Sequence, residues 1–176
     1  MGAMDRTTKA KLAPFCLTLI VVLLDQLSKA WVVATIAENS VGSRYFGDLL
    51  AIIHVRNTAI AFSMGLGLPV AVKIIFFILL PLLLVAAVTI LMVSDRVALK
   101  GVWRWILALF LGGGIGNLID RIFRSFRVVD FISVKVYGFL GFERWPTFNI
   151  ADASLVVSGI LLAILLLFDK GDDLDV

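Results

Sequence analysis

The chain has 176 residues, of which 61% are hydrophobic and only 16% are charged, and its mean hydropathy is +1.04. Soluble domains contain about 45–50% apolar and about 25% charged residues, so this composition excludes an ordinary soluble globule and also a disordered chain. The net charge of +3 is small, and no run of Lys or Arg indicates a nucleic-acid surface. The single cysteine, Cys16, and the single histidine, His54, are too few for an intrachain disulfide or a Cys/His zinc site. Cys16 lies in an apolar run, where a buried thiol is expected.

Four long apolar stretches predict four transmembrane helices, because a bilayer is crossed by about 20 apolar residues in helical form. They cover about residues 12–37, 69–93, 102–119 and 150–168. The second stretch shows no polar face of the kind that a soluble helix carries, and a membrane span tolerates its Pro81. The first stretch is interpreted as a retained span rather than a cleaved signal peptide, because apolar residues continue beyond Asp25 and Lys29.

The segments between the spans predict the topology of one membrane-embedded domain, residues 1–176, with both termini in the cytoplasm. Basic residues precede the first span and occupy the loop between spans two and three, as the positive-inside rule expects for cytoplasmic segments. The external segments are then about 38–68 and 120–149. The second of these also carries five cations, Arg121, Arg124, Arg127, Lys135 and Arg144.

Two stretches of the external segments have a strand-like pattern. Residues 50–55 (LAIIHV) and 128–137 (VVDFISVKVY) are rich in β-branched and aromatic residues, and turn signals follow the second at Gly138 and Gly141. The expected fold is therefore mainly α-helical and integral to the membrane, with a small β element on the external membrane surface.

Polar residues in or beside the spans are the candidates for function, because a charge at the centre of a span costs roughly 2.5–3.5 kcal/mol. Asp25 and Lys29 are four residues apart on one helical face and would form an ion pair. Asn117, Asp120 and Arg121 also share a face at the end of span three, where an Asp–Arg pair would be an ordinary interfacial arrangement.

Two carboxylates stand in apolar surroundings near the external ends of the spans. Asp130 lies among apolar residues in the second strand-like run, and Asp152 begins span four, where Asn149 would cap the helix. Two neighbouring carboxylates share a proton, so one acts as general base on a water while the other donates to a carbonyl. That is aspartic-protease chemistry, and it needs no metal or other cofactor.

The polar motifs, taken in order, resemble those of the lipoprotein signal peptidase (bacterial signal peptidase II) family over roughly residues 12–168. They are Asp25-Gln26-x-x-Lys29; Arg56-Asn57-Thr58 with Ala61-Phe62; Gly113-x-x-Gly116-Asn117-Leu118-Ile119-Asp120-Arg121; Val128-Val129-Asp130-Phe131; and Phe148-Asn149-x-Ala151-Asp152. The family's catalytic dyad maps onto Asp130 and Asp152. Its substrate-binding or supporting residues map onto Asp25, Lys29, Asn57, Asn117, Arg121 and Asn149. The chain has Ala59-Ile60 where the family usually has Gly-Ala, which changes that loop.

The resemblance implies a four-span aspartyl endopeptidase of the bacterial cytoplasmic (inner) membrane, with its active site near the external face. It would cleave the signal peptide from prolipoproteins whose lipobox cysteine carries a diacylglyceryl group. The implied partners are these substrates, membrane lipids and globomycin-type cyclic peptide inhibitors. No cofactor and no nucleic acid is expected, and a monomer is expected.

Two other functions are compatible with parts of the sequence. A small transporter or channel subunit would use Asp25, Lys29 and Asp152 as an intramembrane relay, although no internal repeat is visible. A Ser–Lys protease would need a serine such as Ser63 or Ser154 close to Lys29, because the adjacent Ser28 points away from it on a helix.

Overall fold

The computed structural model describes residues 6–57, 69–97, 99 and 101–168. Its helices are α1 (Arg6–Leu12), α2 (Phe15–Thr35), α3 (Val70–Ile74), η2 (Ile75–Leu79), α4 (Leu80–Val93), α5 (Gly101–Phe123), η3 (Phe139–Gly141) and α6 (Ile150–Phe168). Four helical stretches within the described residues are long and apolar enough to cross a membrane: Thr8–Thr35, Val70–Val93, Gly101–Phe123 and Ile150–Phe168. The expected mainly α-helical membrane fold with four spans is therefore confirmed.

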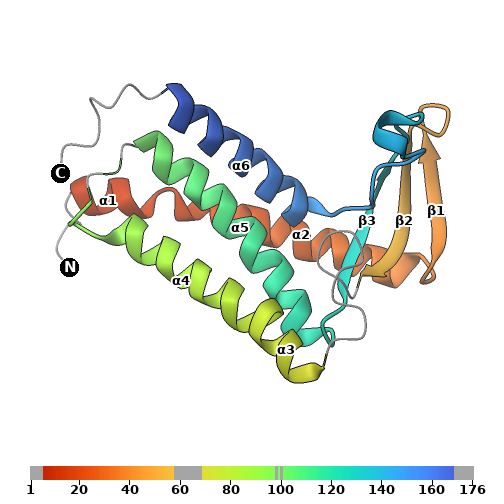
Figure 1. Cartoon of the computed structure of the whole chain (residues 1–176), viewed down its shortest axis with the longest axis horizontal. Coiled ribbons are helices and arrows are strands. Elements are labelled where there is room, and N and C mark those ends of the chain that lie inside the picture. The colour runs from red at the N-terminus through yellow and green to blue at the C-terminus, as the bar shows by residue number, and fades with distance from the viewer. Residues whose placement is uncertain (1–5, 58–68, 98, 100, 169–176) are drawn as a thin grey trace.

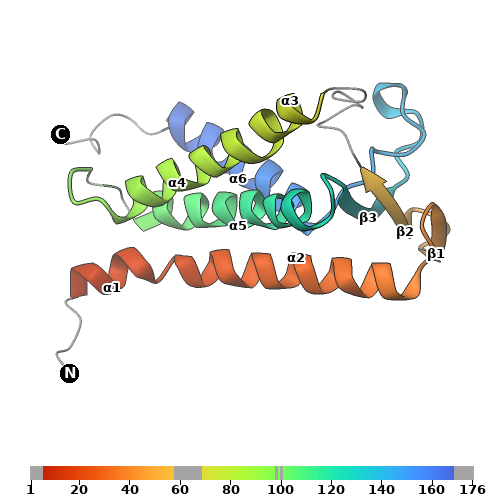
Figure 2. The same ribbon diagram turned by 90° about the horizontal axis from the view of Figure 1, so that it is seen from below.

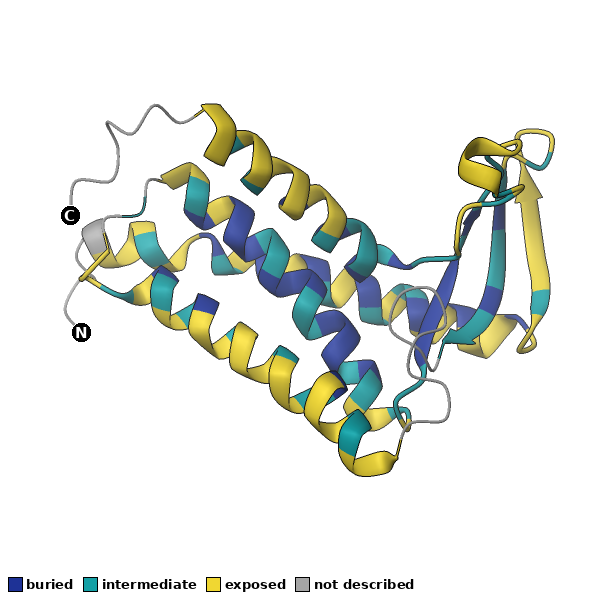
Figure 3. Ribbon diagram, viewed as in Figure 1, coloured by how far each residue is buried: buried dark blue, intermediate teal, exposed yellow. Residues whose placement is uncertain are grey.

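Helix α5 is the centre of the bundle. It packs against α2, α4 and α6, and α2 lies on the opposite side of α5 from α4 (Figure 2). Buried residues concentrate along α5, whereas α4 and α6 expose most of their apolar side chains (Figure 3). Exposed apolar side chains are what a membrane span presents to lipid tails, so α5 is the helix best placed to carry buried polar groups.

Two prolines shape the spans. Pro14 separates α1 from α2, since a proline inside a helix removes a backbone donor and crowds the preceding turn. The turn before Pro81 is the π-helix η2, which widens the backbone where the proline ring would meet the carbonyl of Phe77. Phe77 is the buried side chain of that turn, and it faces α5.

A three-stranded antiparallel sheet covers one end of the bundle (Figure 1). Its strands are β1 (Ser40–Tyr45), β2 (Leu50–Asn57) and β3 (Val128–Val134), in the order β1-β2-β3. On the free side of β3, backbone hydrogen bonds join Ile132 to Phe148 and Val134 to Trp145. This pairing leads the chain directly from the sheet into the first turn of α6, so the start of α6 lies beside β3.

Several sequence-based expectations need correction. Helix α5 continues through Phe123, so residues 120–123 extend this helix and do not form a loop. Asp120 is fully buried, and its ion pairs inside the protein allow the helix to continue. Strand β1 was not expected, because five of its six residues are exposed and no apolar alternation marks it. Cys16 is exposed on the apolar surface of α2 rather than buried.

The glycines of α5 permit close contact with neighbouring helices at specific positions. A Cβ atom on Gly113 would lie 2.5 Å from the carbonyl oxygen of Ala151 and 2.8 Å from Cγ of Leu155, both on α6. A Cβ atom on Gly114 would lie 3.5 Å from its nearest neighbour, Val85, which is an ordinary contact. Gly113 therefore sets the separation of α5 and α6, and Gly114 does not.

The Gly113→Ala variant is expected to lose about 1–3 kcal/mol of stability, because the added methyl forces α5 and α6 apart. Gly114→Ala is the matched control, and it should keep or slightly raise stability because Ala is the better helix former. Thermal unfolding of both variants in detergent measures the difference. Equal melting temperatures would show that the α5–α6 distance is not set at Gly113.

Candidate active site

The first turn of α6 is capped by two of the predicted site residues. The side-chain oxygen of Asn149 accepts the backbone N–H of Asp152 at 2.8 Å. In return, a carboxylate oxygen of Asp152 accepts the backbone N–H of Asn149 at 3.2 Å. This reciprocal arrangement is a capping box, and the helix dipole favours a negative charge at this position. The N-capping role expected for Asn149 is present, and it fixes the Asp152 side chain at the helix start.

Asn149 also connects the two candidate catalytic carboxylates. Its fully buried side-chain amide donates to Asp130 Oδ1 at 2.8 Å and approaches Asn117 Oδ1 at 3.1 Å. Asn117 in turn donates its amide to Asp152 Oδ1 at 2.7 Å. A continuous chain of hydrogen bonds therefore runs Asp130–Asn149–Asn117–Asp152, although the four residues come from β3, the start of α6 and α5.

Asp130 lies on β3 and is 3% exposed. Burial raises the pKa of Asp130 to about 7, and repulsion by Asp152 adds to the shift. Asn57, at the end of β2, donates to Asp130 Oδ2 at 3.2 Å and partly opposes it. The two carboxylates thus interact and differ in environment, as expected for a pair that holds one proton between them.

Lys29 is the hub of a buried charge cluster directly behind these amides. Its ammonium nitrogen lies 2.8 Å from Asp25 Oδ2 and 3.0 Å from Asp120 Oδ2, and all three side chains are fully buried. The same nitrogen donates to Asn117 Oδ1 at 3.2 Å. Because Lys29 needs an acceptor there, it turns the Asn117 amide so that the NH₂ group faces Asp152.

The two acidic partners of Lys29 hold the two elements that carry the candidate dyad. Asp25 Oδ1 accepts the backbone N–H of Ala151 in the first turn of α6, at 3.0 Å. Asp120 Oδ2 accepts the backbone N–H of Val129 in β3, at 3.0 Å. One lysine therefore connects the anchors of α6 and β3, and so fixes Asp152 relative to Asp130.

Arg121 packs on an aromatic ring and does not pair with its neighbour Asp120. Its guanidinium lies over the ring of Phe77, 5.7 Å from the centroid, where Asp130 and Asp152 attract it electrostatically. Asp120 pairs with Lys29 and Arg124 instead, so the interfacial Asp120–Arg121 pair considered from the sequence is wrong.

The described serines do not place a hydroxyl on Lys29. The hydroxyl of Ser28 donates to the carbonyl of Asp25, and that of Ser154 donates to the carbonyl of Ile150, each within its own helix. The Ser–Lys alternative therefore gains no support from this part of the chain. Outside the described residues lie Ser63, Thr58, Ala61-Phe62 and the pair Ala59-Ile60, which differs from the family's usual Gly-Ala.

Sequence reasoning assigned no site role to two further residues of the cluster. Asp120 was recognised as a polar residue on the same helical face as Asn117 and Arg121, but it was not assigned to the site. Gln26 was quoted in a motif without a role, yet its amide lies 3.0 Å from the Gly116 carbonyl and within 3.2 Å of Asp25 and Asp120 oxygens. The available signal was position: both are polar residues within apolar spans, where polar groups need partners.

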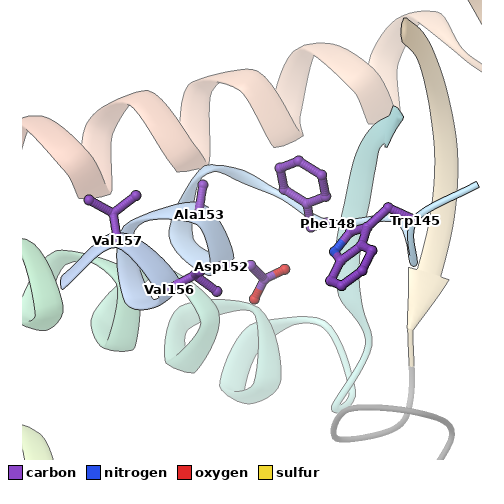
Figure 4. A pocket seen from close by; sticks show the side chains of 6 residues that line it. All are labelled: Trp145, Phe148, Asp152, Ala153, Val156 and Val157. Carbon is purple, nitrogen blue, oxygen red and sulfur yellow. The ribbon is translucent and has the colours of Figure 1, made fainter. Parts of the chain in front are cut away.

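The structure brings all eight sequence-predicted site residues to one end of the bundle, under the sheet. Seven form one connected set of hydrogen bonds and ion pairs: Asp25, Lys29, Asn57, Asn117, Asp130, Asn149 and Asp152. Arg121 is the exception, since it is held by Phe77. Asp152 faces a small cavity beside Phe148 and Trp145 (Figure 4).

Comparison with known proteins gives one consistent family. A family model described as signal peptidase (SPase) II matches residues 17–168. A lipoprotein signal peptidase of Treponema denticola is 46% identical over 151 residues, covering 86% of this chain and 86% of the relative. The lipoprotein signal peptidase of Borrelia duttonii is 43% identical over 151 residues, covering 86% and 87%.

Solved structures agree with the sequence relatives. One bacterial membrane enzyme superposes with a TM-score of 0.76 at 26% identity, covering 93% of each chain. A second superposes with a TM-score of 0.72 at 28% identity, covering 90% of this chain and 94% of the other. With the family model spanning all four apolar helices, the chain belongs to the signal peptidase II family.

Proposed function

We propose that this membrane peptidase is an aspartyl endopeptidase that removes signal peptides from prolipoproteins, cleaving at a lipobox cysteine that carries a diacylglyceryl group. Asp130 and Asp152 are its catalytic pair. The observation that carries the proposal is the hydrogen-bonded chain from Asp130 through Asn149 and Asn117 to Asp152, which joins two carboxylates in unlike surroundings. The alternative of a transporter or channel subunit is not favoured by the family to which the chain belongs.

The surroundings of the two carboxyl groups indicate which one acts as general base and which one acts as general acid. Asp152 accepts two N–H groups at the start of α6, which holds its carboxylate in place as the general base that takes a proton from water. Asp130 has a pKa of about 7, so at neutral pH it retains a proton to donate toward the scissile carbonyl oxygen. Water attack and carbonyl protonation then give a neutral tetrahedral intermediate, and proton transfer to the leaving nitrogen completes hydrolysis.

The remaining polar residues support this reaction in the proposal. Asn57 and Arg121 stand where they would orient a peptide carbonyl or a lipid head group. Asn117 and Asn149 position the acids, and Asp25 and Lys29 hold the elements that carry them. A globomycin-type cyclic peptide would inhibit by occupying the dyad.

The expected orientation in the membrane follows from the same arrangement. The sheet and the dyad lie at one end of the bundle, whereas α1 begins and α6 ends at the opposite end (Figure 1). With both termini in the cytoplasm of a bacterial inner-membrane protein, the dyad is near the external face, where a secreted prolipoprotein emerges. Residues 1–176 act as one membrane-embedded domain and as a monomer in this proposal.

The purified protein is expected to cleave a diacylglyceryl-modified lipobox peptide and to cleave the unmodified peptide much more slowly. Its activity should fall about tenfold per pH unit above about pH 7, because the active pair holds one proton and Asp130 loses it there. Asn57→Ala should move this alkaline limb to higher pH, since the Asn57 hydrogen bond lowers the pKa of Asp130. Initial rates between pH 5 and 9 provide the measurement. Equal cleavage of both peptides would refute the lipid-modified substrate class. A rate that rises steadily with pH would refute the shared proton.

A further inference from the structure

A cavity of about 240 Å³ opens beside the start of α6. Six side chains line it: Trp145, Phe148, Asp152, Ala153, Val156 and Val157. Figure 4 shows the carboxylate of Asp152 pointing toward Phe148 and Trp145, which close the cavity at the sheet end. Only Asp152 and the Trp145 indole carry polar side-chain atoms, so the cavity is an apolar space with a carboxylate in its wall.

The cavity extends from the candidate dyad toward the lipid. Val156 is 61% exposed and Val157 is 48% exposed, and both lie on α6, a membrane-spanning helix. Exposed valines on a span contact acyl chains rather than water. Val156 follows Asp152 by four residues, which places it about 6 Å deeper along the helix axis. An occupant would therefore enter from the bilayer and end at the carboxylate.

The size and lining of the cavity select among the apolar parts of a lipidated peptide. A helix about 10 Å across fills roughly 400 Å³ per turn, so a signal helix is too large for this space. An extended peptide backbone would bring N–H and C=O groups against side chains that offer almost no hydrogen-bond partners, which is costly. A single hydrocarbon chain is narrow enough for its first carbons to enter this space while the rest lies in the bilayer, and it leaves no polar group unpaired.

We propose that this cavity is the subsite for one acyl chain of the diacylglyceryl group on the substrate cysteine. The inference rests on the proposed function, and it adds the surface that recognises the lipid. Trp145, an amphipathic side chain that is 40% exposed, lies at the level of the glycerol, as tryptophans do at membrane interfaces.

Transfer of a chain from lipid to an apolar cavity gains little free energy, because lipid tails are as apolar as the cavity wall. The benefit is orientation: a chain seated along α6 holds the attached cysteine, and so the bond to be cut, next to Asp152. A substitution that fills the cavity should therefore slow the cleavage of long-chain substrates more than it weakens the partitioning of these substrates into the membrane.

The test compares Val156→Trp, which fills the cavity, with Ile160→Trp. Ile160 is the matched control, since it is 54% exposed on the same helix and lies one turn beyond the cavity. Each protein is assayed in the same detergent on lipobox peptides that carry a dipalmitoylglyceryl or a diacetylglyceryl group. Val156→Trp should lower the ratio of kcat/KM for the long-chain over the short-chain peptide by about tenfold or more, as misplacement of a reacting bond does. Ile160→Trp should leave the ratio unchanged.

An unchanged ratio in Val156→Trp would overturn the subsite, whether the rate on both peptides falls equally or stays the same. Failure of wild-type protein to cleave either peptide would instead count against the proposed function. A second measurement does not depend on turnover: a dipalmitoyl peptide with a photoreactive group in one chain is bound to the Asp130→Asn protein. Labelling should concentrate in residues 145–157, and labelling spread over the other spans would contradict the proposal.

Discussion

Replacing Lys29 with methionine is expected to lower the free energy of unfolding by about 3–5 kcal/mol, the loss seen when one partner of a buried ion pair is removed. Lys29 lies 2.8 Å and 3.0 Å from the carboxylates of Asp25 and Asp120, and no part of the three side chains reaches the surface. The variant leaves two buried carboxylates with one ion-pair partner between them, Arg124, which lies 3.3 Å from Asp120. Their backbone partners in α6 and β3 then lose fixed positions, so peptidase activity should fall with stability.

Thermal or denaturant unfolding in detergent measures this loss. Lys73→Met is the control, because Lys73 lies in another apolar span but is partly exposed. The free energy of unfolding of Lys73→Met should fall by less than about 1 kcal/mol, as it does when an exposed charge is removed. The triple variant Asp25→Asn, Lys29→Met, Asp120→Asn should recover part of the stability, since neither position 25 nor position 120 then carries a buried carboxylate without its lysine. If Lys29→Met and Lys73→Met lose equal stability, Lys29 is not the hub of the buried cluster.

The helices were predictable from the sequence, because membrane spans are long and can be recognised by their apolar composition alone. The start of α6 at Ile150 and the end of α4 at Val93 coincide with the expected limits. The end of α5 was missed by four residues, because the charged groups at 120 and 121 read as the start of a loop. Whether a charge ends a span or is buried by a partner depends on tertiary structure, which a single sequence does not display.

The sheet was only partly predictable for a related reason. Strands β2 and β3 bury apolar residues and show a pattern, whereas β1 has the sequence SVGSRY and pairs through its backbone with almost every side chain exposed. The pairing of β3 with Phe148 and Trp145 joins segments that carry no common pattern. That pairing is nevertheless what places Asp152 beside Asp130.

The site residues were predictable as a set, because polar groups are rare in apolar spans, but their partners were not. Asp25 and Lys29 form the expected pair at i and i+4. An interfacial Asp120–Arg121 pair was one of two interpretations of the sequence, yet Asp120 reaches Lys29 on another helix, and Arg121 packs on Phe77. Phe77 lies in the π-helical turn before Pro81. Helix propensities of the residues do not predict this change in the backbone.

The variants Asp130→Asn and Asp152→Asn are each expected to reduce cleavage by about 10²–10⁴-fold, the usual contribution of a positioned general acid or base. An amide has nearly the same shape as a carboxylic acid, but its NH₂ replaces one of two oxygens that each accept an N–H donor. The donor that loses its acceptor costs about 1–3 kcal/mol. Loss of either group alone should cost about as much as loss of both, since the two act as a unit. Folding should be retained, which unfolding curves of the variants in detergent would verify.

Catalysis by Asp130 and Asp152 is tested most directly by kcat/KM on a diacylglyceryl lipobox peptide for wild type, the two variants and Asp48→Asn. Asp48 is the matched control, because it lies at the β1–β2 turn with φ of +74°, which Asn adopts readily, and its ion-pair partners are Arg44 and Arg144 rather than a residue of the dyad. Asp48→Asn is expected to keep wild-type activity, whereas Asp130→Asn and Asp152→Asn are each expected to lose at least about 10²-fold. Wild-type turnover by either dyad variant would contradict catalysis by this pair.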